Sequence, residues 1–410
     1  MGLTRDARLL FATRGLRMFG YGLVSVVLVL YLAAVGLPDT QIGLLLTLTL
    51  LGDAAISLWL TTHADRVGRR RVLLAGAGLM VMAGLGFGAT TAFPVLLIAA
   101  TIGVISPSGN EVGPFLAVEQ AALSQTIPDS ARTRVFAWFN LTGSFATAAG
   151  ALAGGTLASV AIAAGNSPVT AYRGVIFGYA VVAVALGLLF SRVSPAVEAP
   201  APSDVSVARR LGLHRSQRTV ARLSALFALD AFGGGFVVQS LIAYWFHLRF
   251  GADPGVIGAA LFGANILAGF SALAAVRIAA RIGLVRTMVF THLPSNVLLI
   301  LVPLMPTLPL AVAVLLTRFS ISQMDVPTRQ SYTMAVVDPD ERSAAAGITG
   351  IARSIGAAMS PLIAAPLIGG VALAGVPFVL AGGLKIGYDL LLYRGFRNAN
   401  ELDGAATEIR

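Results

Sequence analysis

Residues 64–71 have the sequence ADRVGRRR, a short charged hairpin between two long apolar runs. A related stretch, ARIGLVR at residues 280–286, follows about half a chain length later and also separates two apolar runs. In each stretch a glycine comes two residues after an arginine, and further arginine follows. The pair Ile42-Gly43 recurs in the same way as Ile257-Gly258. This recurrence predicts a chain built from two related halves.

The composition predicts a membrane protein. Of the 410 residues, 56% are hydrophobic and 12% are charged, and the mean hydropathy is +0.82, which leaves too little polar surface for a soluble protein. A transmembrane helix needs about 20 apolar residues, and about twelve continuous runs of that length are present, whereas barrel strands would alternate over about 9–11 residues. We therefore expect an all-α membrane protein with about twelve transmembrane helices in two pseudo-symmetric six-helix bundles. The runs are 9–35, 41–61, 72–91, 93–117, 134–163, 169–190, 222–248, 255–279, 286–305, 308–334, 343–369 and 373–393.

The segment between the sixth and seventh runs is rich in Pro and Ala and then basic, as is typical of a linker. We expect an N-terminal bundle (1–193), a cytoplasmic linker (194–221), a C-terminal bundle (222–396) and a cytoplasmic tail (397–410). Arginines gather in alternate loops, so the positive-inside rule predicts a multi-pass protein of the cell (inner) membrane with both termini in the cytoplasm. Because the net charge of +10 is spread over these loops, it does not indicate a nucleic-acid partner.

The apolar runs, the long middle loop and the hairpin at residues 64–71 resemble the major facilitator superfamily over essentially the whole chain. The superfamily's loop pattern G-x-L-A-D-R-x-G-R-R is matched from Ala64 onward, while Thr61 and His63 replace its first Gly and Leu. The resemblance implies a transporter whose loop locks the two halves together on the cytoplasmic side. The gate residues that it implies are Asp65, Arg66, Gly68 and Arg69.

The fifth run contains GALAGG at residues 150–155, which resembles the antiporter signature G-P-x-x-G-G of drug exporters, with Ala151 in place of the proline. Its counterpart in the second half has a proline, Pro361. Small residues also allow helices to approach closely whatever the function. The resemblance implies drug or metabolite:proton antiport, and we expect Gly150 and Gly154 to be packing residues.

Ionisable side chains inside the membrane are the first candidates for function, since each costs roughly 2.5–3.5 kcal/mol on insertion scales. In the superfamily that this chain resembles, runs one, four, seven and ten line the central cavity. One ionisable candidate lies on each of these runs, in order Arg17, Glu111, Asp230 and Asp325. The candidates for the proton and substrate site are Arg17, Asp53, Asn110, Glu111, Asp230, Asp325 and Arg353.

The internal repeat relates these candidates in pairs. Arg17 and Asp230 occupy equivalent positions in the two halves, and so do Glu111 and Asp325, each of which is followed by a proline. We expect an ion pair between Arg17 and Asp230, which would offset their burial. A buried carboxyl group without a neighbouring cation takes up a proton more readily than one beside an arginine. Asp53 and Glu111 are therefore the predicted proton carriers.

Prolines within a helix remove a hydrogen bond and bend the chain, and interrupted helices at corresponding positions of the two halves indicate a transport site. The strongest interruption is PSGNEVGP at residues 107–114. In the alternative interpretation, the proline at its start only kinks the helix, and Glu111 lies among the lipid headgroups. The predicted helix-break residues are Pro107, Gly109, Pro114 and Pro327.

We expect a secondary transporter that moves a small organic molecule by alternating access. We expect the proton gradient to drive it and the direction of transport to be efflux. An alternative is transport of an organic anion with Arg17 or Arg353 as its counter-ion, and a more remote one is a non-transporting membrane sensor or scaffold. The sequence has no H-E-x-x-H, G-x-S-x-G or P-loop pattern, which argues against an enzyme and against direct ATP drive. The expected partners are a small molecule, protons and the lipid bilayer, without cofactor or metal, and the chain is expected to be a monomer.

Overall fold

The computed structural model describes residues 4–127, 129–198, 213, 215–338, 341–370 and 372–396, and within them it is helical without any strand. Two short 3₁₀ helices, η1 (Pro195–Val197) and η2 (Val302–Leu304), accompany the α-helices. The α-helices are α1 (Arg5–Ala34), α2 (Asp39–Val67), α3 (Arg69–Ala89), α4 (Phe93–Ile102), α5 (Phe115–Thr126), α6 (Asp129–Ala163), α7 (Pro168–Phe190), α8 (Gln217–Gly235), α9 (Gln239–Phe250), α10 (Pro254–Ile282), α11 (Leu284–Leu301), α12 (Leu308–Ser322), α13 (Asp325–Ala335), α14 (Arg342–Met359), α15 (Pro361–Gly369) and α16 (Val376–Phe396).

The predicted apolar runs become these helices, and some of the runs are broken. The described residues contain ten helical stretches that are long and apolar enough to cross a membrane. The two other predicted runs are each divided into shorter helices, the fourth into α4 and α5 and the tenth into α12 and α13. The seventh run is interrupted between α8 and α9, and the eleventh between α14 and α15. The predicted all-helical membrane fold is confirmed.

Contacts divide the chain into two compact units. Unit 1 draws its described residues from Met1–Ser206, Val238–Asn265 and Pro361–Gly369, and unit 2 from Val207–Val237, Ile266–Ser360 and Gly370–Arg410. Unit 1 thus combines the N-terminal helices with α9, the start of α10 and α15. The division of the sequence into bundles at residues 193 and 222 stays a prediction, and most of the linker and all of the tail 397–410 lie outside the described residues.

Small residues set the packing of unit 1, in which α1 lies against α6, α7 and α9, and α2 lies against α15. A side chain at Gly150 would collide with the backbone of Phe19, and one at Gly154 with that of Leu23, so both glycines lie where α6 meets α1. A Cβ atom on Gly43 would come within 2.7 Å of the carbonyl oxygen of the residue that begins α15, Pro361. These close approaches bring α6 against α1 and α2 against α15.

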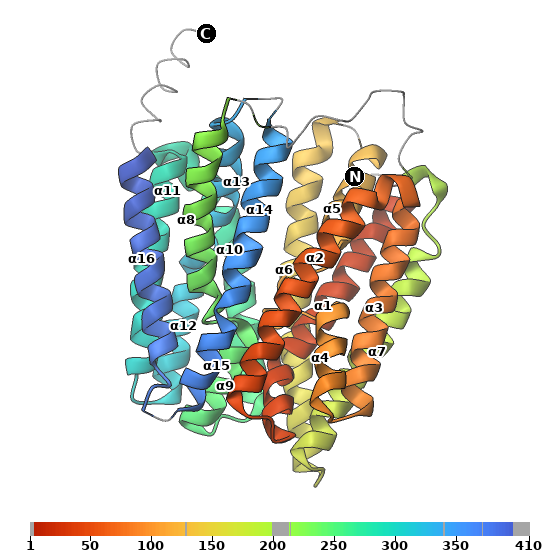
Figure 1. Cartoon of the computed structure of the whole chain (residues 1–410), viewed down its shortest axis with the longest axis vertical. Helices are drawn as coiled ribbons and strands as arrows, with labels where there is room; N and C mark the ends of the chain where they lie inside the picture. The colour runs from red at the N-terminus through yellow and green to blue at the C-terminus, as the bar shows by residue number, and fades with distance from the viewer. Residues whose placement is uncertain are drawn as a thin grey trace. The chain divides into compact units, whose positions relative to one another are not determined.

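In unit 2, α8 packs against α14 and α16, and α11 packs against α16, α12 and α13 (Figure 1). Their contacts form a core of apolar and aromatic side chains, which are Leu223, Phe227, Val285, Met288, Val289, Tyr332, Tyr388 and Leu392. This core holds the helices that carry the buried charges of unit 2.

The two charged hairpins have the same local geometry. The glycine between α2 and α3, Gly68, has a φ of 104°, and the glycine between α10 and α11, Gly283, has a φ of 85°. Side chains disfavour such positive φ values, so each sharp turn requires glycine. The recurrence seen in the sequence is therefore a recurrence of turn conformation.

Candidate transport site

The fourth predicted run is broken by a non-helical segment, residues 103–114, between α4 and α5. Pro107 and Pro114 lie in this segment, and Gly109 adopts a φ of 67°. Backbone that has left the helical pattern inside a membrane needs other hydrogen-bond partners. One such partner is Ser240 of α9, which donates to the carbonyl of Pro107 through both its backbone nitrogen (3.0 Å) and its hydroxyl (2.7 Å).

Further side chains hold the same segment. Tyr21 of α1 donates its hydroxyl hydrogen to the carbonyl oxygen of Val112 at 3.0 Å, and Tyr179 of α7 donates to that of Val104. Asn110 has an exposed side chain within the segment. The segment is therefore tied to α1, α7 and α9.

Four charged side chains of unit 1, of which all but Glu111 are buried, form what we call the unit 1 cluster: Arg14, Arg17, Glu111 and Glu119. Glu119 of α5 accepts two parallel hydrogen bonds from Arg17, at 2.7 and 2.8 Å, and a third from Thr13 at 2.9 Å. Glu111 accepts from Arg17 Nε at 2.9 Å and from Arg14 Nη1 at 2.6 Å. Two arginines thus balance two carboxylates, and the side chains of Arg17 and Glu119 are 0% exposed.

This arrangement corrects two expectations about the unit 1 charges. Arg17, which we expected to pair with Asp230, has its counter-ions within its own unit. Its guanidinium also lies over the ring of Phe115, with 4.6 Å between the guanidinium carbon and the ring centroid. Glu111, predicted to lack a neighbouring cation, has two, and its side chain is 16% exposed.

Asp53, unlike Glu111 and Glu119, forms no ion pair with a cation among the residues that the structure describes. It lies half-buried on α2 and accepts a hydrogen bond from the backbone nitrogen of Gly113 at 2.6 Å and one from the hydroxyl of Ser57 at 3.3 Å. Gly113 belongs to the break between α4 and α5. Asp53 therefore contacts the same segment that carries Glu111.

Unit 2 holds a second group of buried charges, the unit 2 cluster: Asp230, Asp325, Arg329, Arg353 and Lys385. Asp230 of α8 is bonded by Lys385 Nζ at 2.6 Å, by Arg353 Nη1 at 3.0 Å and by Arg329 Nη1 at 3.3 Å. Arg329 also bonds Asp325 at 2.5 Å, one helical turn away on α13. Three cations therefore face two carboxylates, and Arg353 is the most exposed of the three, with 32% of its side chain accessible.

A histidine joins this cluster to a further carboxylate. His292 of α11 contacts Asp389 of α16 through Nδ1 at 2.9 Å, and its Nε2 lies 3.8 Å from Asp230. Asn296 donates to the other oxygen of Asp389 at 3.1 Å. The predicted set of site residues omitted His292 and Asp389.

Several partners missed in the sequence had only weak local signals. Arg14 and Arg17, three residues apart, share one face of α1, and Lys385 and Asp389, four apart, share one face of α16. Glu119 lies just beyond the apolar run predicted to end at residue 117. Spacing along one helix could have suggested the first two pairs, whereas nothing local marks the contact of Glu119 with α1.

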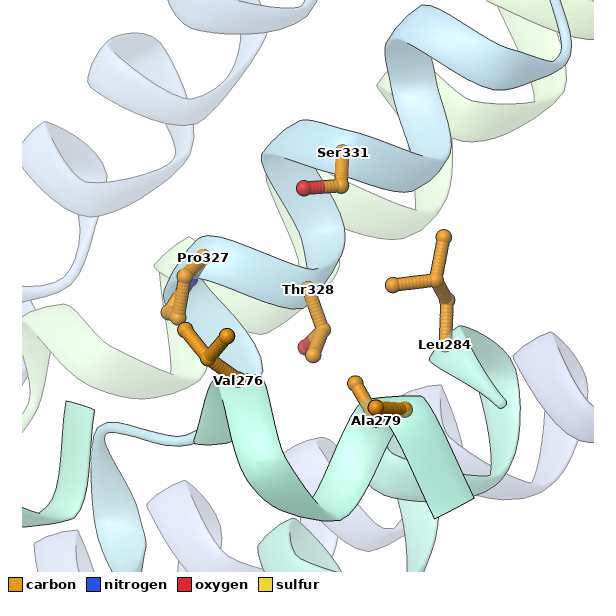
Figure 2. Close-up of a pocket in the computed structure, with 7 residues that line it drawn as sticks. Val276, Ala279, Leu284, Pro327, Thr328 and Ser331 are labelled. Atoms are coloured by element: carbon orange, nitrogen blue, oxygen red, sulfur yellow. The ribbon is translucent and has the colours of Figure 1, made fainter. Parts of the chain in front are cut away.

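One of the predicted helix-break prolines, Pro327, has a different role from the one expected. The break in the tenth run lies before Asp325, and Pro327 stands in the first turn of α13, where a proline is tolerated. It helps to line a cavity of about 300 Å³ between α10, α11 and α13 (Figure 2). The residues around this cavity are Val276, Ala279, Ala280, Leu284, Pro327, Thr328 and Ser331.

The predicted gate hairpin is held by Glu198, the residue that follows η1. Glu198 accepts hydrogen bonds from the backbone nitrogens of Arg69 (2.6 Å) and Arg70 (3.2 Å) at the start of α3. Arg69 is buried and also donates to the backbone carbonyl of Val197, the last residue of η1, while Arg66 is exposed. The side chain of Asp65 lies outside the part of the chain that the structure describes.

Apolar spanning helices, two of them broken beside buried charges in corresponding positions of the sequence, are the architecture of a membrane transporter. A sequence model of the Major Facilitator Superfamily matches residues 10–389, and the chain belongs to this superfamily. It is thus a multi-pass membrane protein from a superfamily of secondary transporters, which carry small molecules and are not enzymes.

Similar proteins agree with this assignment. The uncharacterized membrane protein YJR124C of Saccharomyces cerevisiae is 30% identical over 419 residues, which cover 95% of this chain and 93% of that protein. Among solved structures, a mutant form of the nucleoside transporter NupG has a TM-score of 0.75 at 12% identity, covering 96% of this chain and 99% of that one. A D-xylose-proton symporter has a TM-score of 0.71 at 14% identity, with 94% and 97% covered. At these identities the structural likeness concerns the fold alone.

Proposed function

We propose that this protein is a proton-coupled transporter that exports a small organic molecule by alternating access, with Asp53 as the proton carrier. The hydrogen bond between Asp53 and Gly113 is the observation that carries the proposal. It joins a carboxyl group without a cation to the broken helix segment, and broken helices are where transporters of this kind bind their substrates and ions.

The charge of Asp53 can control that segment. An ionised carboxylate accepts a hydrogen bond about twice as strong as a neutral acceptor does. Uptake of a proton by Asp53 therefore weakens its bond to the Gly113 nitrogen and loosens the link between α2 and the break. Glu111 is tethered to α1 by two hydrogen bonds, one from Arg14 and one from Arg17, and stays paired in both states.

Proton movement into proteoliposomes tests this proposal. The purified protein is reconstituted with a pH-sensitive dye inside, and compounds from a panel of drugs and metabolites are added against an imposed pH gradient. Asp53→Asn is expected to abolish compound-dependent proton movement. Ser57→Ala is the matched control, because it removes only the 3.3 Å hydrogen bond and leaves the carboxyl group. Proton movement that survives Asp53→Asn would exclude Asp53 as the carrier.

The direction of transport and the membrane location are part of the same proposal. Export is supported by the resemblance of residues 150–155 to the antiporter signature, and the arginine-rich loops support cytoplasmic termini in a cell membrane. A monomer is the proposed unit of transport. Reversing the imposed pH gradient distinguishes antiport from symport. In antiport the compound moves in the direction opposite to the protons, and in symport it moves in the same direction as the protons.

A further inference from the structure

Arg318 is a buried cation without a counter-ion among the residues that the structure describes. It lies on α12, about 15 Å along the helix axis from the first residue of that helix, and it is 9% exposed. Among the described residues it forms no ion pair, and its buried Nε has no hydrogen-bond partner. Its guanidinium carbon lies 4.9 Å from the ring centroid of the adjacent Phe319. An aromatic ring attracts a cation but does not neutralise it.

The depth of Arg318 makes this lack of a partner informative. The hydrocarbon core of a bilayer is about 30 Å thick, so a position about 15 Å into a spanning run is near its middle. Charged side chains at such depths are rare and mark substrate or ion pathways, because the alternative is an unfavourable charge in hydrocarbon. A lipid headgroup stays at the membrane surface and is therefore a poor counter-ion for Arg318.

A second buried polar group without a partner lies beside Arg318. Ser322 is one helical turn further along α12, so both side chains lie on one face of the helix. Ser322 is 4% exposed, and its hydroxyl has no hydrogen-bond partner within the described residues. Buried polar groups are nearly always hydrogen-bonded, so two unpaired donors on one face indicate a missing acceptor.

The nearby carboxylates do not supply that acceptor. Arg318 is within electrostatic range of Asp325 and Asp230. Asp325 is bonded by Arg329, and Asp230 is shared by three cations of the unit 2 cluster. This part of unit 2 already has more cations than these carboxylates balance, and Arg318 adds another. One more negative charge would reduce the excess.

We propose that Arg318 and Ser322 bind the oxyanion of a small organic carboxylate, which is the molecule that this protein transports. The guanidinium supplies the charge and a fork of N–H donors, a geometry suited to a carboxylate, and the hydroxyl supplies one further donor. This inference rests on the proposed transport function and names its substrate class. It also revises the counter-ion expected from the sequence, which was Arg17 or Arg353. Arg17 is already paired with two carboxylates and Arg353 with Asp230, so Arg318 takes that role.

Thermal unfolding of the full-length protein in detergent tests the site without any gradient. The probes are benzoate and succinate, and the neutral isostere benzamide and sodium chloride at equal ionic strength are the references. A ligand that binds only the folded protein raises Tm. At least one of the two carboxylates is expected to raise Tm with increasing concentration until the site saturates. Benzamide and chloride are expected to leave Tm unchanged. Vesicles of phosphatidylglycerol are a further arm, and a shift with this lipid alone would assign the site to a headgroup and overturn the proposal.

Variants assign the effect to the residues named. Arg318→Gln is expected to weaken the carboxylate response at least tenfold, and to leave the ligand-free Tm equal to or above that of the parent, because an unpaired buried charge is removed. Arg318→Lys keeps the charge and is expected to keep part of the response. Arg249→Gln, which alters an exposed cation of α9, is the matched control and is expected to retain the full response.

Three results would overturn the anion site. These are the absence of any Tm shift with either carboxylate, a full shift in Arg318→Gln, and a ligand-free Tm of Arg318→Gln well below that of the parent, which would mark a structural arginine. Failure here is separable from failure of the proposed function. Carboxylate binding is measured at equilibrium, whereas proton coupling is measured with a gradient in the parent and in Asp53→Asn. If the parent protein moves protons with neutral compounds only, the substrate class is refuted and the proposed proton-coupled transport is not.

Discussion

The pair of Arg17 and Glu119 provides a quantitative test of what holds unit 1 together. Both side chains are 0% exposed, and Glu119 accepts two bonds from Arg17 and one from Thr13. Glu119→Gln keeps the shape of the side chain but removes its charge and replaces one acceptor oxygen with an amide donor. Arg17 then keeps a single carboxylate partner, Glu111.

Breaking a buried ion pair by removing one partner costs about 3–5 kcal/mol. Because Arg17 retains its bond to Glu111, we expect the loss from Glu119→Gln at the lower end, about 3 kcal/mol. An exposed pair would lose only about 0.2–1 kcal/mol. The free energy of unfolding, measured by denaturant titration in mixed micelles, separates these two values.

A double-mutant cycle supplies the control. The variants Arg17→Met and Glu119→Leu are compared singly and together. The double variant leaves no unpaired charge and is expected to recover much of the stability lost in either of these single variants. A loss below about 1 kcal/mol for Glu119→Gln, or losses from the two single variants that simply add in the double variant, would refute the assignment of this pair as the main ionic contact between α1 and α5.

Three further predictions follow from contacts within one unit. Gly150→Val is expected to destabilise the protein by at least about 1–3 kcal/mol, because the added side chain collides with Phe19; a thermal unfolding scan that matches the parent would contradict this. Glu198→Gln is expected to cost about 1 kcal/mol, since it weakens the cap on the first nitrogens of α3; hydrogen exchange of the first turn of α3 would report it, and unchanged protection would exclude the cap. His292→Gln is expected to cost about 1–3 kcal/mol in unfolding free energy by removing a partner of the buried Asp389. An equal loss in His247→Gln, a histidine of unit 1, would show the effect to be nonspecific.

The internal repeat acquires a new meaning from these contacts. The sequence relates Arg17 to Asp230 and Glu111 to Asp325, which led us to expect a pair between the halves. In the structure, Arg17 bonds Glu111 within unit 1, and Arg329 bridges Asp230 and Asp325 within unit 2. The repeat-related positions thus meet inside each unit, with the signs of the first pair of positions exchanged.

Much of the site was predictable because its signals are local. Apolar runs indicate which residues cross the membrane, and prolines and glycines within residues 107–114 predict a break that the structure has at residues 103–114. A charged residue inside an apolar run, such as Asp53, Glu111 or Asp230, stands out by the cost of burying it. Membership of the superfamily and the helical fold followed from these local patterns.

The ion-pair partners were decided by the tertiary structure. Arg17 and Glu119 are separated by 102 residues, and Asp230 and Lys385 by 155 residues. Position along an apolar run indicates how deep a side chain lies, but not toward which neighbouring helix it points. That direction depends on the rotation and packing of each helix. These are set here by close approaches such as that of Gly150 on α6 to Phe19 on α1. The sequence therefore determined which charges are buried, whereas only the packed helices decided that Arg17 is neutralised and that Arg318 is not.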